Sequence, residues 1–345
     1  MIGKVGDFLQ RAHYPLVPDL IKYYGFVSVL FFSGIALTLA FMSKYPSLLT
    51  MAFLSFTLGL QHAFDIDHVT VIDNITRKMV NDNQNTHGIG FSFSFGHSLV
   101  VILMSILTIL FVEWSKEIMP SLENVGSIIG SSFAGLTLIL LALINLHILI
   151  GIWRNFKSVN KNLKEVQFDK SWVYKRFDKL LHLINHNWQV VLIGFVFGLG
   201  LDTATQISVL ATSAVSTSQG VPWYAVLSFP LLFTSGMCLM DTSDGIFMST
   251  AYSWVFSSPI RKVYYNLILT GLSVLAAIFS GIVNLSIATK LIFHSTNNWF
   301  IWIENLNFFY LGITLVAVFI VIWILAIAGW YYFGLDKKEE IVNLK

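Results

Sequence analysis

Long apolar runs dominate the chain and are separated by short polar stretches. Eight of these runs are at least about 18 residues long, which is the length an α-helix needs to cross the hydrocarbon core of a bilayer. They cover residues 24–42, 48–72, 89–112, 128–153, 188–212, 223–248, 265–288 and 308–333. The pattern predicts an all-α integral membrane protein with eight transmembrane helices, in which residues 1–345 form a single transmembrane domain.

Basic residues are distributed unevenly among the connections between these runs. An even number of spans puts both termini on one side, and assigning that side to the cytoplasm leaves only Lys44, Lys116 and Lys290 outside among the 21 Lys and Arg residues. Because Lys and Arg are retained on the cytoplasmic side of a membrane, both termini are expected in the cytoplasm of a protein of the cell membrane. Arg77 and Lys78 then belong to a cytoplasmic loop. Residues 154–187, between the fourth and fifth spans, form a long basic loop on the same side.

Composition agrees with a lipid-embedded chain. Of the 345 residues, 55% are hydrophobic and only 12% are charged, so the excess apolar surface has to face lipid. The single cysteine, Cys238, excludes an internal disulfide and a metal site built from several cysteines. The net charge of +2 gives no sign of a nucleic-acid partner, and no obligate protein partner is inferred.

The second apolar run contains a concentrated group of ionisable side chains. His62, Asp65, Asp67 and His68 lie within seven residues, although a charged group at the bilayer centre costs about 2.5 to 3.5 kcal/mol even on the gentler insertion scales. On a regular helix, with about 100° per residue, His62, Asp65 and His68 share one face and Asp67 points away. Imidazole and carboxylate without thiolate suit Ni(II), Co(II), Zn(II), Mn(II) or Fe(II). Simple charge pairing is the structural alternative.

Three further spans carry polar side chains that could join this group. His97 lies between Gly96 and Ser98, whose small side chains allow close helix approach. Asp202 follows a glycine-rich stretch that indicates an interrupted or tightly packed helix, and Asp241 lies in the sixth span. We therefore expect a site near the membrane midplane formed by His62, Asp65 and His68 and joined by His97, Asp202 or Asp241. Asp67 would bind the metal directly if the helix is unwound, or would orient a histidine.

The spans with polar residues also suggest internal symmetry. Leu58-Gly-Leu before Asp65 is similar to Phe197-Gly-Leu-Gly-Leu before Asp202, and Phe95-Gly-His to Ser235-Gly-Met. On the predicted topology the second and fifth spans run in opposite directions, as do the third and sixth. This arrangement is typical of an inverted repeat with a binding site at the repeat interface.

These four segments together resemble the nickel/cobalt permease (NiCoT) family of eight-span transporters. The second-span signature of that family, His-x4-Asp-His, is matched by His62, Asp67 and His68. The third-, fifth- and sixth-span patterns are matched by Phe93-Ser-Phe-Gly-His-Ser98, by Leu199-Gly-Leu-Asp-Thr-Ala-Thr205, and by Gly236, Met237 and Asp241. The chain departs from the fifth-span pattern where the family has Glu and this sequence has Gln206.

The resemblance implies uptake of Ni(II), Co(II) or both across the cytoplasmic membrane, with the metal as substrate and no cofactor. The expected metal-binding residues are His62, Asp65, Asp67, His68, His97, Asp202 and Asp241. The roles of Gln206, His147 and Asp244 stay open, as do the preference between the two metals, the energy source and the oligomeric state.

Two other functions fit parts of the pattern. A Zn(II), Mn(II) or Fe(II) carrier would use the same ligand types, because selectivity among these metals comes from geometry and availability. A membrane metalloenzyme would need several histidine-rich boxes or a His-Glu-x-x-His pair, and the sequence has no His-Glu-x-x-His. We therefore expect a transporter and not an enzyme. A metal sensor is disfavoured because the sequence offers no sizeable soluble output domain.

Overall fold

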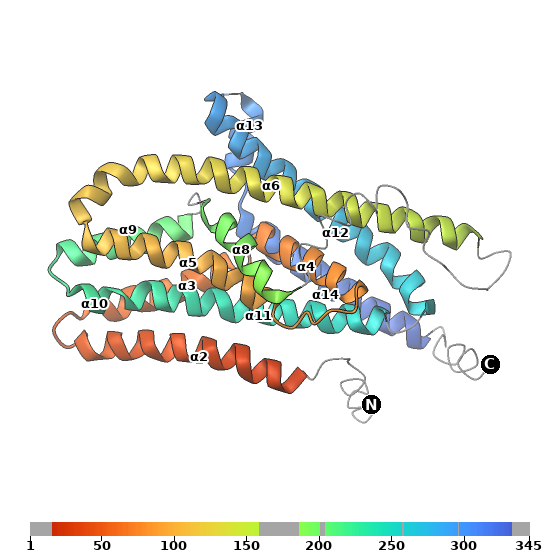
Figure 1. Cartoon of the computed structure of the whole chain (residues 1–345), viewed down its shortest axis with the longest axis horizontal. Helices are drawn as coiled ribbons and strands as arrows, with labels where there is room; N and C mark the ends of the chain where they lie inside the picture. Colours follow the sequence, from red (N-terminus) through yellow and green to blue (C-terminus); the bar gives the residue numbers. More distant parts are fainter. Residues whose placement is uncertain (1–15, 159–185, 201–203, 257–258, 296, 333–345) are drawn as a thin grey trace.

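The computed structural model describes residues 16–158, 186–200, 204–256, 259–295 and 297–332, and the regular structure in these residues is helical (Figure 1). The longer helices are α2 (Leu16–Phe41), α3 (Ser47–His62), α4 (Ile66–Asn81), α5 (Ile89–Leu110), α6 (Val112–Ser158), α8 (Asn187–Gly198), α9 (Ala204–Ser218), α11 (Ser228–Phe256), α12 (Pro259–Phe293) and α14 (Phe308–Tyr332). Two short helices, α10 (Trp223–Val226) and α13 (Asn298–Glu304), complete the described set. The all-α prediction is confirmed for this part of the chain.

Most of the predicted membrane spans correspond to helices of sufficient length and apolarity. Within the described residues six helices qualify as spans, or seven if α3 and α4 are one broken span. The predicted fifth span falls on α8 and α9, and residues 201–203 between them lie outside the described ranges. The first residues of α2 and the last residues of α14 lie toward the same end of the molecule (Figure 1). The count of eight spans and the side of the membrane that holds the termini stay predictions.

The connections around the fourth span differ from the expectation. Helix α6 begins directly after Phe111 and continues to Ser158, so residues 112–127 are helical where a polar connection was expected. Residues 154–158, expected in the basic loop, form the end of the same helix. The rest of that loop, up to residue 185, lies outside the described residues.

The bundle exposes apolar side chains and encloses polar ones. Phe32, Phe53 and Leu275 are each about two-thirds exposed (66%, 69% and 68%), as befits side chains that face lipid. In contrast, His62, His68, His97 and Asp241 are almost fully buried. Intramembrane ionisable groups of this kind almost always face the interior of a bundle and mark a pathway for ions or substrates. The buried polar side chains in the interior of the bundle are therefore the candidate functional residues.

Glycines bring the helices that surround this interior into backbone contact. In the α3–α11 pair and in the α5–α8 pair, each helix places a glycine against a carbonyl oxygen of its partner. The four contacts, given as the distance from a Cβ built on the glycine to the carbonyl oxygen, are Gly59 to Phe233 (2.1 Å), Gly236 to Phe56 (2.5 Å), Gly194 to Phe93 (2.0 Å) and Gly96 to Val191 (2.0 Å). In every case the contacted residue lies three positions before the partner's own glycine. The two pairs thus pack in the same way.

The ends of α3 and α8 are also covered in the same way by a neighbouring helix. Gly312 of α14 lies against the carbonyl of Phe64, just after α3, and Gly126 of α6 lies against the carbonyl of Leu199, just after α8. Phe64 follows Gly59 by five positions, and Leu199 follows Gly194 by five positions. Both helix ends are therefore held by an adjacent helix that approaches at a glycine.

Candidate metal site

The second span is broken where its ionisable residues occur, and this corrects the expectation of one regular helix. Helix α3 ends at His62, α4 begins at Ile66, and their axes differ in direction by 52°. Asp65 has extended backbone angles immediately before α4, and Asp67 lies in the first turn of that helix. Aspartate is favoured at both places because acidic side chains stabilise the positive N-terminal end of a helix. The Asp-x-Asp sequence therefore favours a new helix start within the apolar run.

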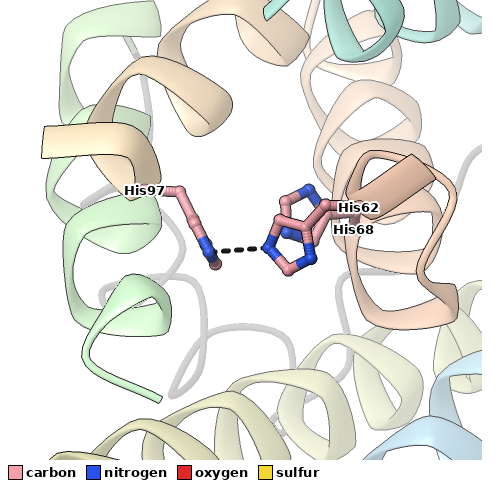
Figure 2. A group of neighbouring side chains, drawn as sticks. All are labelled: His62, His68 and His97. Atoms are coloured by element: carbon pink, nitrogen blue, oxygen red, sulfur yellow. Dashed lines mark hydrogen bonds between the residues drawn. The ribbon is translucent and has the colours of Figure 1, made fainter. Parts of the chain in front are cut away.

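Three histidines from three helices meet beside this break (Figure 2). His62 is the last residue of α3, His68 lies in the first turn of α4, and His97 faces them from α5. One ring nitrogen from each lies within 4.8 Å of the others, and the Nε2 atoms of His62 and His97 are 3.0 Å apart. The side chains of His62 and His68 converge as expected, although they do so across a broken helix.

Two carboxylates form hydrogen bonds with the Nδ1 atoms of two of these imidazoles. Asp65 Oδ2 lies 2.9 Å from Nδ1 of His62, and Asp241 Oδ2 lies 3.0 Å from Nδ1 of His68. Because a carboxylate only accepts hydrogen bonds, Nδ1 is the donor in each pair, and Nε2 of the neutral ring keeps its lone pair. Among the described residues, Nε2 of His68 has no hydrogen-bond partner although it is buried. Carboxylate–imidazole pairs of this kind orient histidines that bind metal ions.

Close helix packing sets the position of His97. A Cβ at Gly194 of α8 would lie 3.1 Å from the backbone nitrogen of His97, and one at Gly198 would lie 2.7 Å from its carbonyl oxygen. A larger residue at either position would push α5 away from α8. The glycine-rich sequence of the fifth span therefore allows α5 to carry His97 to the other two histidines.

Helix α9 adds two polar side chains to the cluster. Nε2 of Gln206 lies 3.0 Å from Nε2 of His62 and 2.7 Å from Nε2 of His97, and Oγ1 of Thr205 lies 3.1 Å from Nδ1 of His62. Neither residue was among the expected ligands. Gln206 stood out in the sequence only as a departure from the NiCoT pattern.

The four aspartates among the expected ligands differ in how they are related to the cluster. Asp67 is half-buried, and its Oδ1 accepts a hydrogen bond from the backbone N–H of His68. Asp202 lies outside the described residues. Asp241 contacts the cluster through His68, and Asp65 contacts it through His62. The role of each of these aspartates as a direct ligand stays a prediction.

A second buried polar group lies further along α4 and corrects the placement of Arg77 in a loop. Arg77 is 2% exposed, and its guanidinium donates to Thr270 Oγ1 at 2.8 Å and to the carbonyl of Leu269 at 3.1 Å. Its Nη2 lies 3.5 Å from Asp73 Oδ1, and Tyr252 also donates to Asp73. Helix α4 is thereby tied to α11 and α12. Arg77 had been interpreted as a loop residue because its charge lies near the end of an apolar run.

The donor set at the histidine cluster suits a divalent transition metal. Three imidazole nitrogens and one amide group converge, and imidazole is a ligand for Zn, Cu, Fe and Ni. The cluster is enclosed, since all three histidines are at most 3% exposed. An ion that enters it has to leave its hydration shell and take protein ligands in exchange.

Comparisons with known proteins agree with this chemistry. A family model described as "High-affinity nickel-transport protein" matches residues 48–328. The chain is 38% identical over 296 residues to "Nickel transporter NixA" of Staphylococcus aureus, a match that covers 84% of this chain and 87% of that protein. It is 39% identical over 299 residues to "Nickel transporter NicT" of Mycobacterium tuberculosis, covering 82% and 79% of the two chains.

A more distant relative is named for a different metal. "Cobalt transport protein NhlF" of Rhodococcus rhodochrous is 29% identical over 316 residues, which cover 87% of this chain and 88% of that protein. The search of solved structures found no match.

Proposed function

This chain belongs to the family of high-affinity nickel-transport proteins, and on that premise we propose that it takes up Ni(II), Co(II) or both across the cytoplasmic membrane. The metal is the transported substrate. Relatives named for nickel and one named for cobalt support both ions as substrates. A Zn(II), Mn(II) or Fe(II) carrier remains the alternative that the competition experiment below tests.

The observation that carries this proposal is the convergence of His62, His68 and His97. Their ligand atoms lie within 4.8 Å of one another inside a helical bundle with apolar outer surfaces. We propose that Nε2 of each ring binds the metal and that Asp65 and Asp241 orient His62 and His68 through Nδ1. Asp67 and Asp202 are retained as further candidate ligands that act when the ion enters or leaves.

Two interrupted spans lie at the level of this site, and this supports transport by alternating access. The first interruption separates α3 from α4, and the second separates α8 from α9. Secondary transporters bind ions where broken helices meet near the bilayer midplane, with the carboxyl ends of half-helices directed at cations. His62, the last residue of α3, occupies such a carboxyl end.

The matching glycine contacts support an inverted repeat. Helices α3 and α8 run in opposite directions in Figure 1, as do α5 and α11. The α3–α11 pair and the α8–α5 pair have the same spacing of glycines and contacted carbonyls. We propose that these pairs belong to two halves related by a pseudo-two-fold axis, and that rocking of one half against the other opens the site to each side in turn.

Radiolabelled Ni(II) uptake into proteoliposomes tests the proposal. Three proteins are compared: the parent, His62→Ala, and His294→Asn as a control in which an exposed histidine at the end of α12 is replaced. Excess unlabelled Co(II), Zn(II), Mn(II) or Fe(II) is added in parallel. We expect uptake by the parent and the control, competition by Co(II) above the other ions, and less than about a tenth of parental uptake by His62→Ala.

Two results would contradict the proposal. The substrate assignment is wrong if Zn(II), Mn(II) or Fe(II) competes better than Co(II). The site assignment is wrong if His62→Ala, present in the membrane in equal amount, transports as the parent does.

A further inference from the structure

We infer that Gln206 is a metal-binding residue of this site, with an amide that caps the histidines when no ion is bound and binds the ion through its oxygen when one is present. This inference rests on the proposed function, because it assigns a further ligand to the same site. It adds a neutral oxygen donor from α9 to the three imidazoles.

The side-chain amide of Gln206 lies where the Nε2 atoms of two imidazoles meet. Its Nε2 is 3.0 Å from Nε2 of His62 and 2.7 Å from Nε2 of His97, and these two ring nitrogens are 3.0 Å from each other. The three atoms form a nearly equilateral triangle. Gln206 is fully buried, so water does not compete for these positions.

The size of this triangle matches one face of a metal coordination sphere. Bonds from a divalent first-row ion to protein nitrogen or oxygen are about 2.1 Å long, so adjacent ligands of an octahedral ion lie about 3.0 Å apart. The three observed separations are 2.7 to 3.0 Å. Little movement of the two rings and the amide is therefore needed for them to share one ion.

The amide also explains how the Nε2 atoms of His62 and His97 are hydrogen-bonded when no ion is bound. Nδ1–H of His62 donates a hydrogen bond to Asp65, so Nε2 of that ring keeps its lone pair. A primary amide has two N–H donors on one nitrogen, so the Nε2 group of Gln206 can donate to His62 and His97 together. In the tautomer of His97 that has its proton on Nδ1, two imidazole lone pairs 3.0 Å apart would otherwise face each other in a buried space, which is unfavourable.

The oxygen of the same amide is available for the loaded state. Oε1 of Gln206 is buried and finds no hydrogen-bond partner in the described part of the protein. An amide binds a cation through its oxygen, so a half-turn about the last side-chain bond exchanges the N–H cap for an oxygen ligand. No backbone movement of α9 is required for this exchange.

A neutral donor at this position also balances the charge of the loaded site. The carboxylates of Asp65 and Asp241 contact the histidine rings, and together they offset the two charges of the ion. A carboxylate in place of Gln206 would add a third negative group. We expect such a site to hold the ion more tightly and to release it more slowly.

Metal binding by the full-length protein in detergent tests this inference with three variants. Gln206→Leu removes both amide functions, Gln206→Glu replaces the neutral oxygen donor by a charged one, and Ser213→Ala is the control. Ser213 is also buried in α9, but its hydroxyl donates to the carbonyl of Val209 in the same helix. The Kd for Ni(II) is measured by equilibrium dialysis, and the visible absorption spectrum of the Co(II)-loaded protein reports the ligand geometry.

The variants should change the Kd in opposite directions. We expect Gln206→Leu to raise the Kd for Ni(II) about tenfold or more and to alter the Co(II) spectrum. Gln206→Glu should lower the Kd about tenfold and reduce the rate of Ni(II) uptake in proteoliposomes. Ser213→Ala should match the parent in all three measurements.

Several outcomes would overturn the assignment of Gln206. A parental Co(II) spectrum in Gln206→Leu would show that the amide is not a ligand, even if the affinity falls. A Gln206→Glu protein that binds Ni(II) more weakly than the parent would also contradict it. A parent that binds and transports Ni(II) while both variants behave like it would refute only this inference, whereas a parent that binds no Ni(II) would refute the proposed function as well.

Discussion

Nδ1 of His68 lies 3.0 Å from Oδ2 of Asp241, although the two residues are 173 positions apart and belong to α4 and α11. Both side chains are almost fully buried, and the other ring nitrogen of His68 has no partner among the described residues. The pair fixes which nitrogen of His68 carries the proton and which one faces the cluster.

Removal of the charge of Asp241 should therefore weaken metal binding without removing a ligand. In Asp241→Asn the amide can present its N–H group to His68, which reverses the tautomer and directs an N–H toward the metal. We expect the Kd for Ni(II) to rise about 10- to 100-fold. The measurement is equilibrium dialysis, with Thr250→Val as a control on the same helix, where the hydroxyl donates to the carbonyl of Ile246. An unchanged Kd in Asp241→Asn would mean that this carboxylate does not orient the ring.

Gly312 should be sensitive to substitution although α14 contributes no ionisable group to the cluster. A Cβ at this position would lie 1.6 Å from the carbonyl oxygen of Phe64, between His62 and Asp65. Gly312→Ala therefore has to displace the break between α3 and α4. We expect a loss of about 1 to 3 kcal/mol in stability and a clear reduction in Ni(II) uptake.

The matched control for this substitution is Gly271→Ala in α12, where a Cβ meets no atom within 4 Å. Thermal unfolding in detergent and uptake in proteoliposomes are measured for both variants. Gly271→Ala should keep parental stability and uptake. Equal behaviour of the two variants would show that the approach of α14 does not position the break.

The pairing of Arg77 with Asp73 should be visible as coupling in a double-mutant cycle. Arg77→Gln leaves the buried carboxylate of Asp73 without its guanidinium partner, and the loss of one member of a buried ion pair costs about 3 to 5 kcal/mol. Asp73→Asn combined with Arg77→Gln removes both charges, so the double variant should be more stable than Arg77→Gln alone. Unfolding measured by tryptophan fluorescence or calorimetry gives the four values. Additive effects would argue that the pair contributes no interaction energy.

The predicted topology can be tested with single cysteines. The native thiol of Cys238 is fully buried, so the parent provides a low background for labelling. Lys44→Cys and His186→Cys introduce thiols at exposed positions on opposite sides of the predicted membrane. A membrane-impermeant maleimide should label Lys44→Cys in intact cells and should label His186→Cys only after permeabilisation. The reverse result would place the termini outside.

The parts of the fold that could be predicted from the sequence are those set by the lipid environment. A bilayer requires about 20 apolar residues for each helix, and the runs at residues 89–112 and 308–333 agree closely with α5 and α14. The break at residues 63–65 was not predicted, because apolar residues continue on both sides of it. Only the Asp-x-Asp pattern at Asp65 and Asp67 indicated a helix start, and Asp65 had been interpreted as part of a continuous ligand face from which Asp67 points away.

The site was predictable to the extent that charge is unfavourable inside a membrane. His62, His68 and Asp241 were identified because ionisable side chains are rare in apolar runs, and His97 because Gly96 and Ser98 allow a close neighbour. The contact between His68 and Asp241 could not be derived, since it depends on how α4 and α11 pack. Gln206 carries no charge, so the same argument could not identify it.

The four reciprocal contacts of Gly59, Gly236, Gly96 and Gly194 place backbone against backbone at these positions of the two interfaces. Helices slide past each other by small rearrangements of the side chains at their interface, and at these four positions backbone atoms are in contact instead. The α3–α11 pair and the α5–α8 pair are therefore each expected to move as a rigid unit. Any movement that admits or releases an ion would then occur between these two rigid units, where His62 of one meets His97 of the other.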